Sequence, residues 1–235
     1  EDRSALTALW GESEDAASWL EAAKAYLDEH GYTLNDTWNY AINYELATWD
    51  GIASSYTSDH YFVAPTWAPL LEYDAKNVQQ PGIAESYEVS EDGLTYTFTM
   101  RDGLKWSNGD ELTAKDFEWS WRRAADPKTA ADYSYLCAVF AGYDDTKGLA
   151  ADDVVASDDG KTLTVKLKAV TPYFLDLCAF PFFFPVNQKS VEGNDDWAND
   201  ASDKFVTNGA FTLKEWKHDS SMTYVKNPNY WDADN

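Results

Sequence analysis

A chain of 235 residues, 44% of them hydrophobic, is long enough to fold around one large or two modest cores, which excludes a disordered protein. Its 41 acidic and 18 basic residues give a formal net charge of −23, which argues against nucleic acid and against electrostatic docking on an anionic membrane. No window holds the ~20 apolar residues needed to span a bilayer.

The N-terminal stretch has the pattern of an amphipathic helix. Between residues 13 and 30, apolar side chains recur at helical spacing, at Ala16, Trp19, Leu20, Ala23 and Leu27. Gly31 stands where the helix should end, because glycine adopts the left-handed conformation of a C-terminal cap at no steric cost. We interpret residues 1–37 as a helical arm. A first strand is predicted over residues 38–46, where aromatic and apolar residues alternate with polar ones.

Residues 81–125 carry the strongest local signals. Asp92-Gly93 predicts a tight turn, and the residues after it alternate between apolar residues and threonines, which predicts a hairpin with one apolar face. Thr113, with Asp116 three positions later, predicts the capped start of a helix. The core of this region is predicted to contain Trp106, Phe117, Trp121 and Ala124.

The other elements follow from the same kinds of signal. We predict a helix over 61–68, a helix-like run over 136–141, a second hairpin about Asp159-Gly160 and a helix opening at Thr171-Pro172. We also predict an apolar strand or loop over 182–185, and strands over 211–215 and 222–225 joined by a turn at 216–219. Both hairpins contain Ser-x-Asp-Gly-x-Thr, which we interpret as repeated turn chemistry rather than a repeat architecture.

The two cysteines, Cys137 and Cys178, both lie in apolar surroundings. Free buried thiols and a single disulfide are both compatible with the sequence, and free thiols are the favoured interpretation. The three histidines are dispersed and show no metal-ligand spacing with the cysteines, so neither a metal site nor a cofactor is expected.

Several sequence blocks together resemble one protein family. They are IAESY at 83–87, KWSNG at 105–109, DPKTA at 126–130, TNGAF at 207–211 and KNPNYWD at 226–232. In this order they resemble the extracellular solute-binding proteins of family 5, the oligopeptide- and dipeptide-binding proteins of ABC importers. Residues 45–50 resemble a further family block, with Trp49 in place of the usual leucine and Gly51 in place of the usual proline.

The resemblance implies an α/β fold of the periplasmic-binding-protein-like class, with mixed sheets. Residues 38–56 and 168–235 would form the core of one lobe, and residues 57–167 an inserted, β-rich signature subdomain. A second lobe, which in this family carries the carboxylate that holds the peptide α-amino group, is absent from these residues. The resemblance also implies an extracellular or periplasmic protein, tethered as a lipoprotein, whose signal segment is missing from this chain.

The resemblance assigns ligand-binding residues as well. Glu45, Leu46 and Ala47 stand where the family pairs its backbone with peptide, and the alternative is an ordinary strand end. Tyr133 stands at the position of a cleft tyrosine, and the alternative is a packed loop aromatic. Asn208 and Gly209 are the remaining ligand-binding candidates. The alternative to ligand binding, for both, is a purely conformational role.

The predicted function is therefore the substrate-binding component of an ABC importer, which captures oligopeptides or dipeptides and delivers them to a membrane permease. A monomer with no nucleic-acid partner is expected. No nucleophile elbow, phosphate loop or zinc-protease motif occurs, so no catalysis is expected. The alternatives are a secreted glycoside hydrolase, which needs a carboxylate pair across an aromatic cleft, and a family member that binds a nickel chelate or a sugar.

Overall fold

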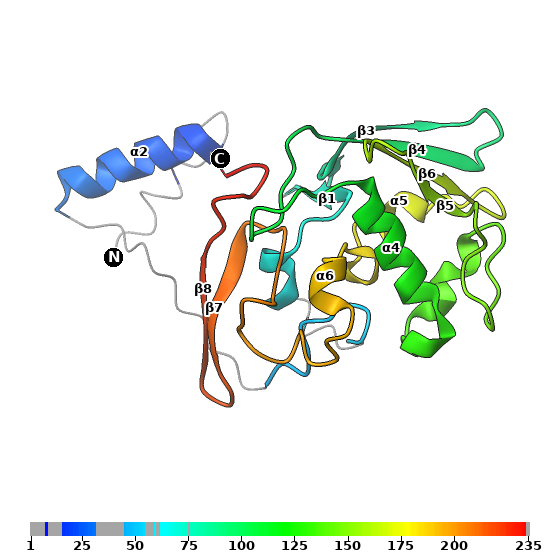
Figure 1. Ribbon diagram of the computed structural model, residues 1–235. Coiled ribbons are helices and arrows are strands. Elements are labelled where there is room, and N and C mark those ends of the chain that lie inside the picture. The colour runs from blue at the N-terminus through cyan, green and yellow to red at the C-terminus, as the bar shows by residue number, and fades with distance from the viewer. Residues whose placement is uncertain are drawn as a thin grey trace. The chain divides into compact units, whose positions relative to one another are not determined.

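The computed structural model describes residues 8, 16–31, 45–54, 59, 62–74 and 76–233 (Figure 1). The chain divides into two compact units, Glu1–Asn43 and Tyr44–Asn235. In the first unit, helix α2 spans Ala16–Glu29 and Gly31 follows it with φ of 72°, as predicted. The start of the predicted helix, at residues 13–15, and most of the predicted strand 38–46 lie outside the described residues. Residues 45 and 46 themselves are irregular.

A four-stranded antiparallel sheet organises the second unit. Its strand order is β3-β4-β6-β5, and the strands span Ala84–Val89 (β3), Thr95–Met100 (β4), Val154–Ala156 (β5) and Thr162–Lys166 (β6). Both predicted hairpins are confirmed, and the glycine of each turn, Gly93 and Gly160, has φ of 71°. The sequence did not reveal that β4 pairs with β6, which places Thr97 opposite Thr164 and joins the two hairpins into one sheet.

Helix α4, Ala114–Ala125, begins as the sequence predicts. The Thr113 hydroxyl accepts a hydrogen bond from Lys115 N, and the Asp116 carboxylate accepts one from Thr113 N at 2.8 Å, so both halves of the capping box are present. The helix packs against β5 and β6 (Figure 1). On its inner face the fully buried Trp121 donates its Nε1–H to Phe183 O at 2.8 Å. This bond ties the helix to the apolar segment 182–185.

Short elements connect and flank these parts. They are η1 Ala64–Thr66, β1 Leu71–Tyr73, β2 Gln79–Pro81, η2 Pro127–Thr129, η3 Ser134–Val139, α5 Phe174–Leu177, η4 Pro181–Phe183, α6 Gln188–Val191, β7 Phe211–Lys217 and β8 Ser221–Lys226. The strands β7 and β8 form a separate antiparallel hairpin, orange to red in Figure 1. The cysteines are free and buried, as favoured by the sequence interpretation.

Three predicted helical segments differ from the structure. The helix over 61–68 ends in a single 3-10 turn, and Trp67 is extended because Ala68 N is already bonded to the Asn208 side chain. The opening at Thr171-Pro172 is wrong, since α5 begins only at Phe174. The Thr171 hydroxyl donates to Ala169 O instead of capping the helix. The helix-like run over 136–141 is the 3-10 helix η3, which begins and ends two residues earlier.

The last hairpin also differs from its predicted bounds. A β-bulge between Leu213 and Glu215 inserts one residue into β7. The bulge turns both Leu213 and Trp216 toward the core, where each is 7% exposed. Trp216, predicted in the turn, therefore belongs to the strand, and the turn begins only after Lys217.

Candidate functional site

Residues 45–50 form an irregular segment held by its buried side chains. Leu46 and Trp49 are buried, whereas Ala47 between them is exposed. Trp49 N donates to Ala198 O at 3.1 Å. Within the described part of the chain, the backbone of Ala47 makes no hydrogen bond. The main-chain N–H and C=O of this exposed residue are thus without a hydrogen-bond partner among the described residues.

The C-terminal end of this segment is fixed by an ion pair and by a close backbone approach. Arg123, in the last turn of α4, bonds both carboxylate oxygens of Asp50, at 3.2 and 2.5 Å. At Gly51 a Cβ would lie 3.0 Å from Pro181 O. This tight contact explains why glycine suits position 51.

The N-terminal end of the segment is fixed by Glu45. Its carboxylate accepts hydrogen bonds from Trp216 Nε1 at 2.8 Å, from His218 Nδ1 at 2.9 Å and from Asp219 N at 3.0 Å. All these donors belong to β7 or to the turn after it. The predicted candidates Glu45, Leu46 and Ala47 therefore lie on one segment anchored at both ends.

Tyr133 lies in an aromatic cluster near this segment. Its half-buried ring meets Phe180 edge-on, with 5.7 Å between centroids, and meets Tyr135 at 6.0 Å. Tyr135 is 62% exposed. Phe180 precedes Pro181, which lines a small cavity together with Gly51. Tyr133 is thus linked to residues 45–51 through the 180–181 peptide.

Asn208 and Gly209 lie against a different backbone segment. The Asn208 amide is 1% exposed and both donates to Ala68 O and accepts from Ala68 N, each at 2.9 Å. At Gly209 a Cβ would lie 2.4 Å from Thr66 C and from Trp67 N. These contacts place the start of β7 against residues 66–68. A direct contact of Asn208 or Gly209 with ligand stays a prediction.

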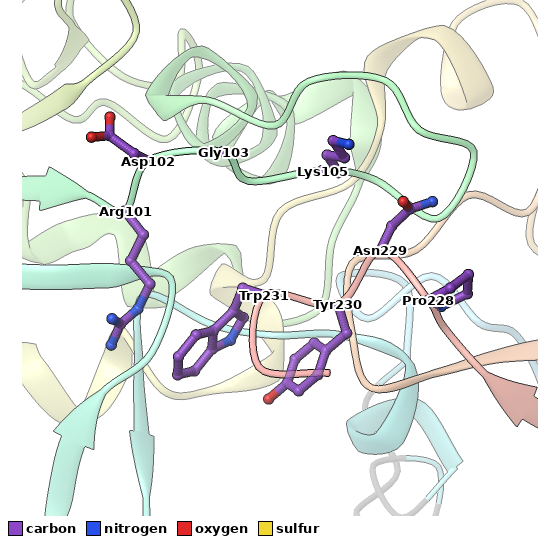
Figure 2. A pocket seen from close by; sticks show the side chains of 8 residues that line it. All are labelled: Arg101, Asp102, Gly103, Lys105, Pro228, Asn229, Tyr230 and Trp231. Atoms are coloured by element: carbon purple, nitrogen blue, oxygen red, sulfur yellow. The ribbon is translucent and has the colours of Figure 1, made fainter. Parts of the chain in front are cut away.

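A cavity with a volume of about 240 Å³ lies elsewhere among the described residues (Figure 2). It is lined by Arg101, Asp102, Gly103, Lys105, Pro228, Asn229, Tyr230 and Trp231. The Arg101 guanidinium lies 4.0 Å from the centroid of the Trp231 ring and donates Nε–H to Gly82 O. Burial raises the pKa of Tyr230 to about 12. None of the predicted ligand-binding residues line this cavity, which lies where the C-terminal segment crosses the end of β4.

Among the residues that the structure describes, no group of three His, Cys, Asp or Glu side chains is placed to hold a metal ion. Burial raises the pKa of the Cys137 thiol to about 12 and raises that of Cys178 as well. None of the described helices has the length and apolarity required to span a membrane.

Sequence reasoning missed the residues that hold the candidate segment. Trp216, His218 and Arg123 lie 171, 173 and 73 positions from their partners at 45 and 50. No periodicity or turn signal reports contacts over such separations. The only indirect signal was the departure at Gly51, which marks a close backbone approach.

The fold defines the class of protein, an α/β fold like that of the periplasmic binding proteins. The sequence pattern of the bacterial extracellular solute-binding proteins, family 5, middle region, matches residues 78–235. The chain belongs to this family.

Individual relatives agree with this assignment. The oligopeptide-binding protein OppA of Bacillus subtilis is 42% identical over 175 residues, which are 73% of this chain and 32% of that protein. The substrate-binding domain of an oligopeptide ABC transporter from Bacillus anthracis has a TM-score of 0.78 at 38% identity, covering 83% of this chain and 38% of that one. Listeria monocytogenes OppA bound to peptide has a TM-score of 0.75 at 37% identity, covering 80% and 38%. The chain thus spans about a third of the length of the relatives it matches.

Proposed function

We propose that this chain is the N-terminal part of the substrate-binding component of an ABC importer, which captures oligopeptides or dipeptides between two lobes and delivers them to a membrane permease. The observation that carries the proposal is the exposed, unpaired backbone of Ala47 on a segment anchored at Glu45 and Asp50. An extended peptide satisfies such a backbone by adding itself as a strand.

The other candidates support this geometry in different ways. Tyr133 and Tyr135 offer an aromatic wall, linked to the segment through Phe180, for side chains of the peptide. We assign Asn208 and Gly209 a structural role, which is to hold the start of β7 against residues 66–68. A contact of either residue with the ligand would depend on this position.

The remaining features of the proposal follow from membership of the family. We assign residues 38–56 and 168–235 to the lobe core, residues 57–167 to the inserted subdomain, and residues 1–37 to a helical arm. The complete protein works as a monomer outside the cytoplasmic membrane, tethered to it as a lipoprotein, and performs no catalysis. Two lobes close about a hinge when ligand binds.

The first test is a thermal-shift screen of the complete protein against di- to octapeptides, sugars and nickel chelates. A ligand that binds the native state raises the melting temperature in proportion to the logarithm of its concentration. Stabilisation by peptides alone supports the proposal. Stabilisation only by sugars or chelates overturns the substrate class, and hydrolysis of an oligosaccharide would establish the glycosidase alternative.

A second test addresses Ala47 directly. Ala47→Pro removes the backbone N–H, whereas Ala47→Ser keeps it and serves as the matched control. We expect the proline variant of the complete protein to bind peptide about tenfold more weakly, since a lost hydrogen bond of ~1.4 kcal/mol corresponds to that factor. Equal affinity of the two variants would contradict backbone pairing at this residue.

A further inference from the structure

The Glu45 carboxylate is already occupied by the protein itself. One oxygen accepts from Trp216 Nε1 at 2.8 Å and from His218 Nδ1 at 2.9 Å, and the other accepts from Asp219 N at 3.0 Å. An ionised carboxylate has about four acceptor sites, so these donors use most of them. The side chain is 33% exposed, so the site is only partly open to solvent.

Trp216 connects both ends of the candidate segment. Its ring nitrogen bonds Glu45, and its ring meets the fully buried Trp49 edge-on, with 6.1 Å between centroids. Trp216 is itself 7% exposed and belongs to β7. One rigid aromatic side chain thus contacts both Glu45 and Trp49, two residues before and two residues after the exposed Ala47.

His218 and Asp219 complete this attachment from the turn. The His218 ring packs on Trp216 with 4.1 Å between centroids and an interplanar angle of 36°. Asp219 has φ of 57°, in the left-handed region that non-glycine residues adopt rarely. That conformation accompanies the hydrogen bond from its N–H to Glu45. Asp219 lies in the hairpin turn between β7 and β8, where aspartate adopts this conformation more readily than most residues.

We propose that Trp216 and His218 are positioning residues for ligand capture, which act by holding Glu45 and thereby fixing the backbone of Ala47. This inference rests on the proposed function. Glu45 contributes to peptide affinity through the position of its own main chain and not through contact of its carboxylate with the ligand. Its effect on affinity is therefore independent of the charge of the peptide's side chains.

The test compares binding of alanine-rich and lysine-containing peptides to the complete protein by calorimetry. Trp216→Phe keeps an aromatic ring, smaller than the indole, and removes the Nε1–H donor. Glu45→Gln keeps the shape and removes the charge. Each variant is expected to lose about tenfold in affinity for both peptides alike, and the double variant is expected to lose less than the product of the two. A loss confined to lysine-containing peptides in Glu45→Gln would overturn the inference and assign Glu45 to direct contact.

His218 supplies a second pair of variants that does not disturb the core. His218→Leu removes the donor, and His218→Asn places an amide N–H near the position of Nδ1. We expect His218→Leu to bind peptide about fivefold more weakly than the parent, which corresponds to the loss of one hydrogen bond. We expect His218→Asn to recover the affinity of the parent. Lys217→Gln is the control, because the native Lys217 side chain pairs with Glu215. This variant should bind peptide as tightly as the parent does.

Amide hydrogen exchange separates positioning from a merely stabilising role. Without peptide, Trp216→Phe and His218→Leu should exchange faster over residues 45–48, with no change in β4. Unchanged exchange over 45–48, or equal losses of affinity in His218→Leu and His218→Asn, would refute the inference. If the parent protein binds none of the peptides, the proposed function itself fails, and this outcome is distinct from variants that bind as tightly as the parent.

Discussion

Arg123 and Asp50 form a two-point ion pair that joins the C-terminal end of α4 to the end of the candidate ligand-binding segment. The guanidinium contacts both carboxylate oxygens, and the two side chains are 18% and 6% exposed. The pair is therefore largely shielded from water. Its geometry makes the position of residues 48–50 depend on α4, the helix whose start is the best-defined signal in the sequence.

Removing one member of this pair should destabilise the protein strongly. Arg123→Met leaves the Asp50 carboxylate buried without its partner, and we expect a loss of about 3 kcal/mol in the free energy of unfolding, measured by urea denaturation. Lys161→Met is the matched control, because its pair with Asp102 is exposed. An equal midpoint for the parent and Arg123→Met would show that the ion pair has no net effect.

Gly209→Ala should destabilise the protein because there is no room for a Cβ. The added atom would lie 2.4 Å from backbone atoms of residues 66 and 67, which cannot move without breaking the Asn208 hydrogen bonds. We expect a cost of about 2–3 kcal/mol, of the size that overpacking produces. Gly103→Asn is the control, since that site is open and asparagine tolerates its φ of 73°. Thermal melts of both variants give the comparison, and equal melting temperatures would contradict the close approach.

The thiols should be unreactive in the native protein and should make stability fall at high pH. Burial raises the pKa of Cys137 to about 12, above the ~8.5 of an unfolded thiol. The contribution of the protonated thiol to the free energy of unfolding is fully present below about pH 8. It is lost as the pH rises toward 12, because the thiol ionises first in the unfolded state. Iodoacetamide at pH 8 should label neither cysteine until urea is added, while Val155→Cys at an exposed strand position should label at once. Mass spectrometry counts the labels, and rapid native labelling would contradict the burial.

The sequence predicted what depends on near neighbours in the chain. Asp92-Gly93 and Thr113 specify a turn and a helix start through contacts a few residues long, and both are confirmed. The family blocks extended this to the fold class, because they report on an entire inherited architecture.

Contacts between residues far apart in the chain could not be predicted from the sequence. Nothing local indicates that Glu45 bonds Trp216, or that the Asn208 amide replaces a backbone partner for Ala68. The bulge in β7 has the same origin, because only the tertiary burial of Trp216 favours the extra residue there. The helix start predicted at Thr171 was wrong for a related reason. The Thr171 hydroxyl donates a hydrogen bond to the carbonyl oxygen two residues earlier and does not cap the helix that follows.

The contact between Gly51 and Pro181 restricts how this protein can change over evolutionary time. Proline, the residue that resembling sequences carry at position 51, has a Cβ that would meet Pro181 O at 3.0 Å. Its acquisition here would first require a displacement of the 180–181 peptide. Since Phe180 packs on Tyr133, that displacement would also move the aromatic cluster. Any side chain at position 51 thus requires a small shift of the Pro181 carbonyl, which lies next to the contact between Phe180 and Tyr133.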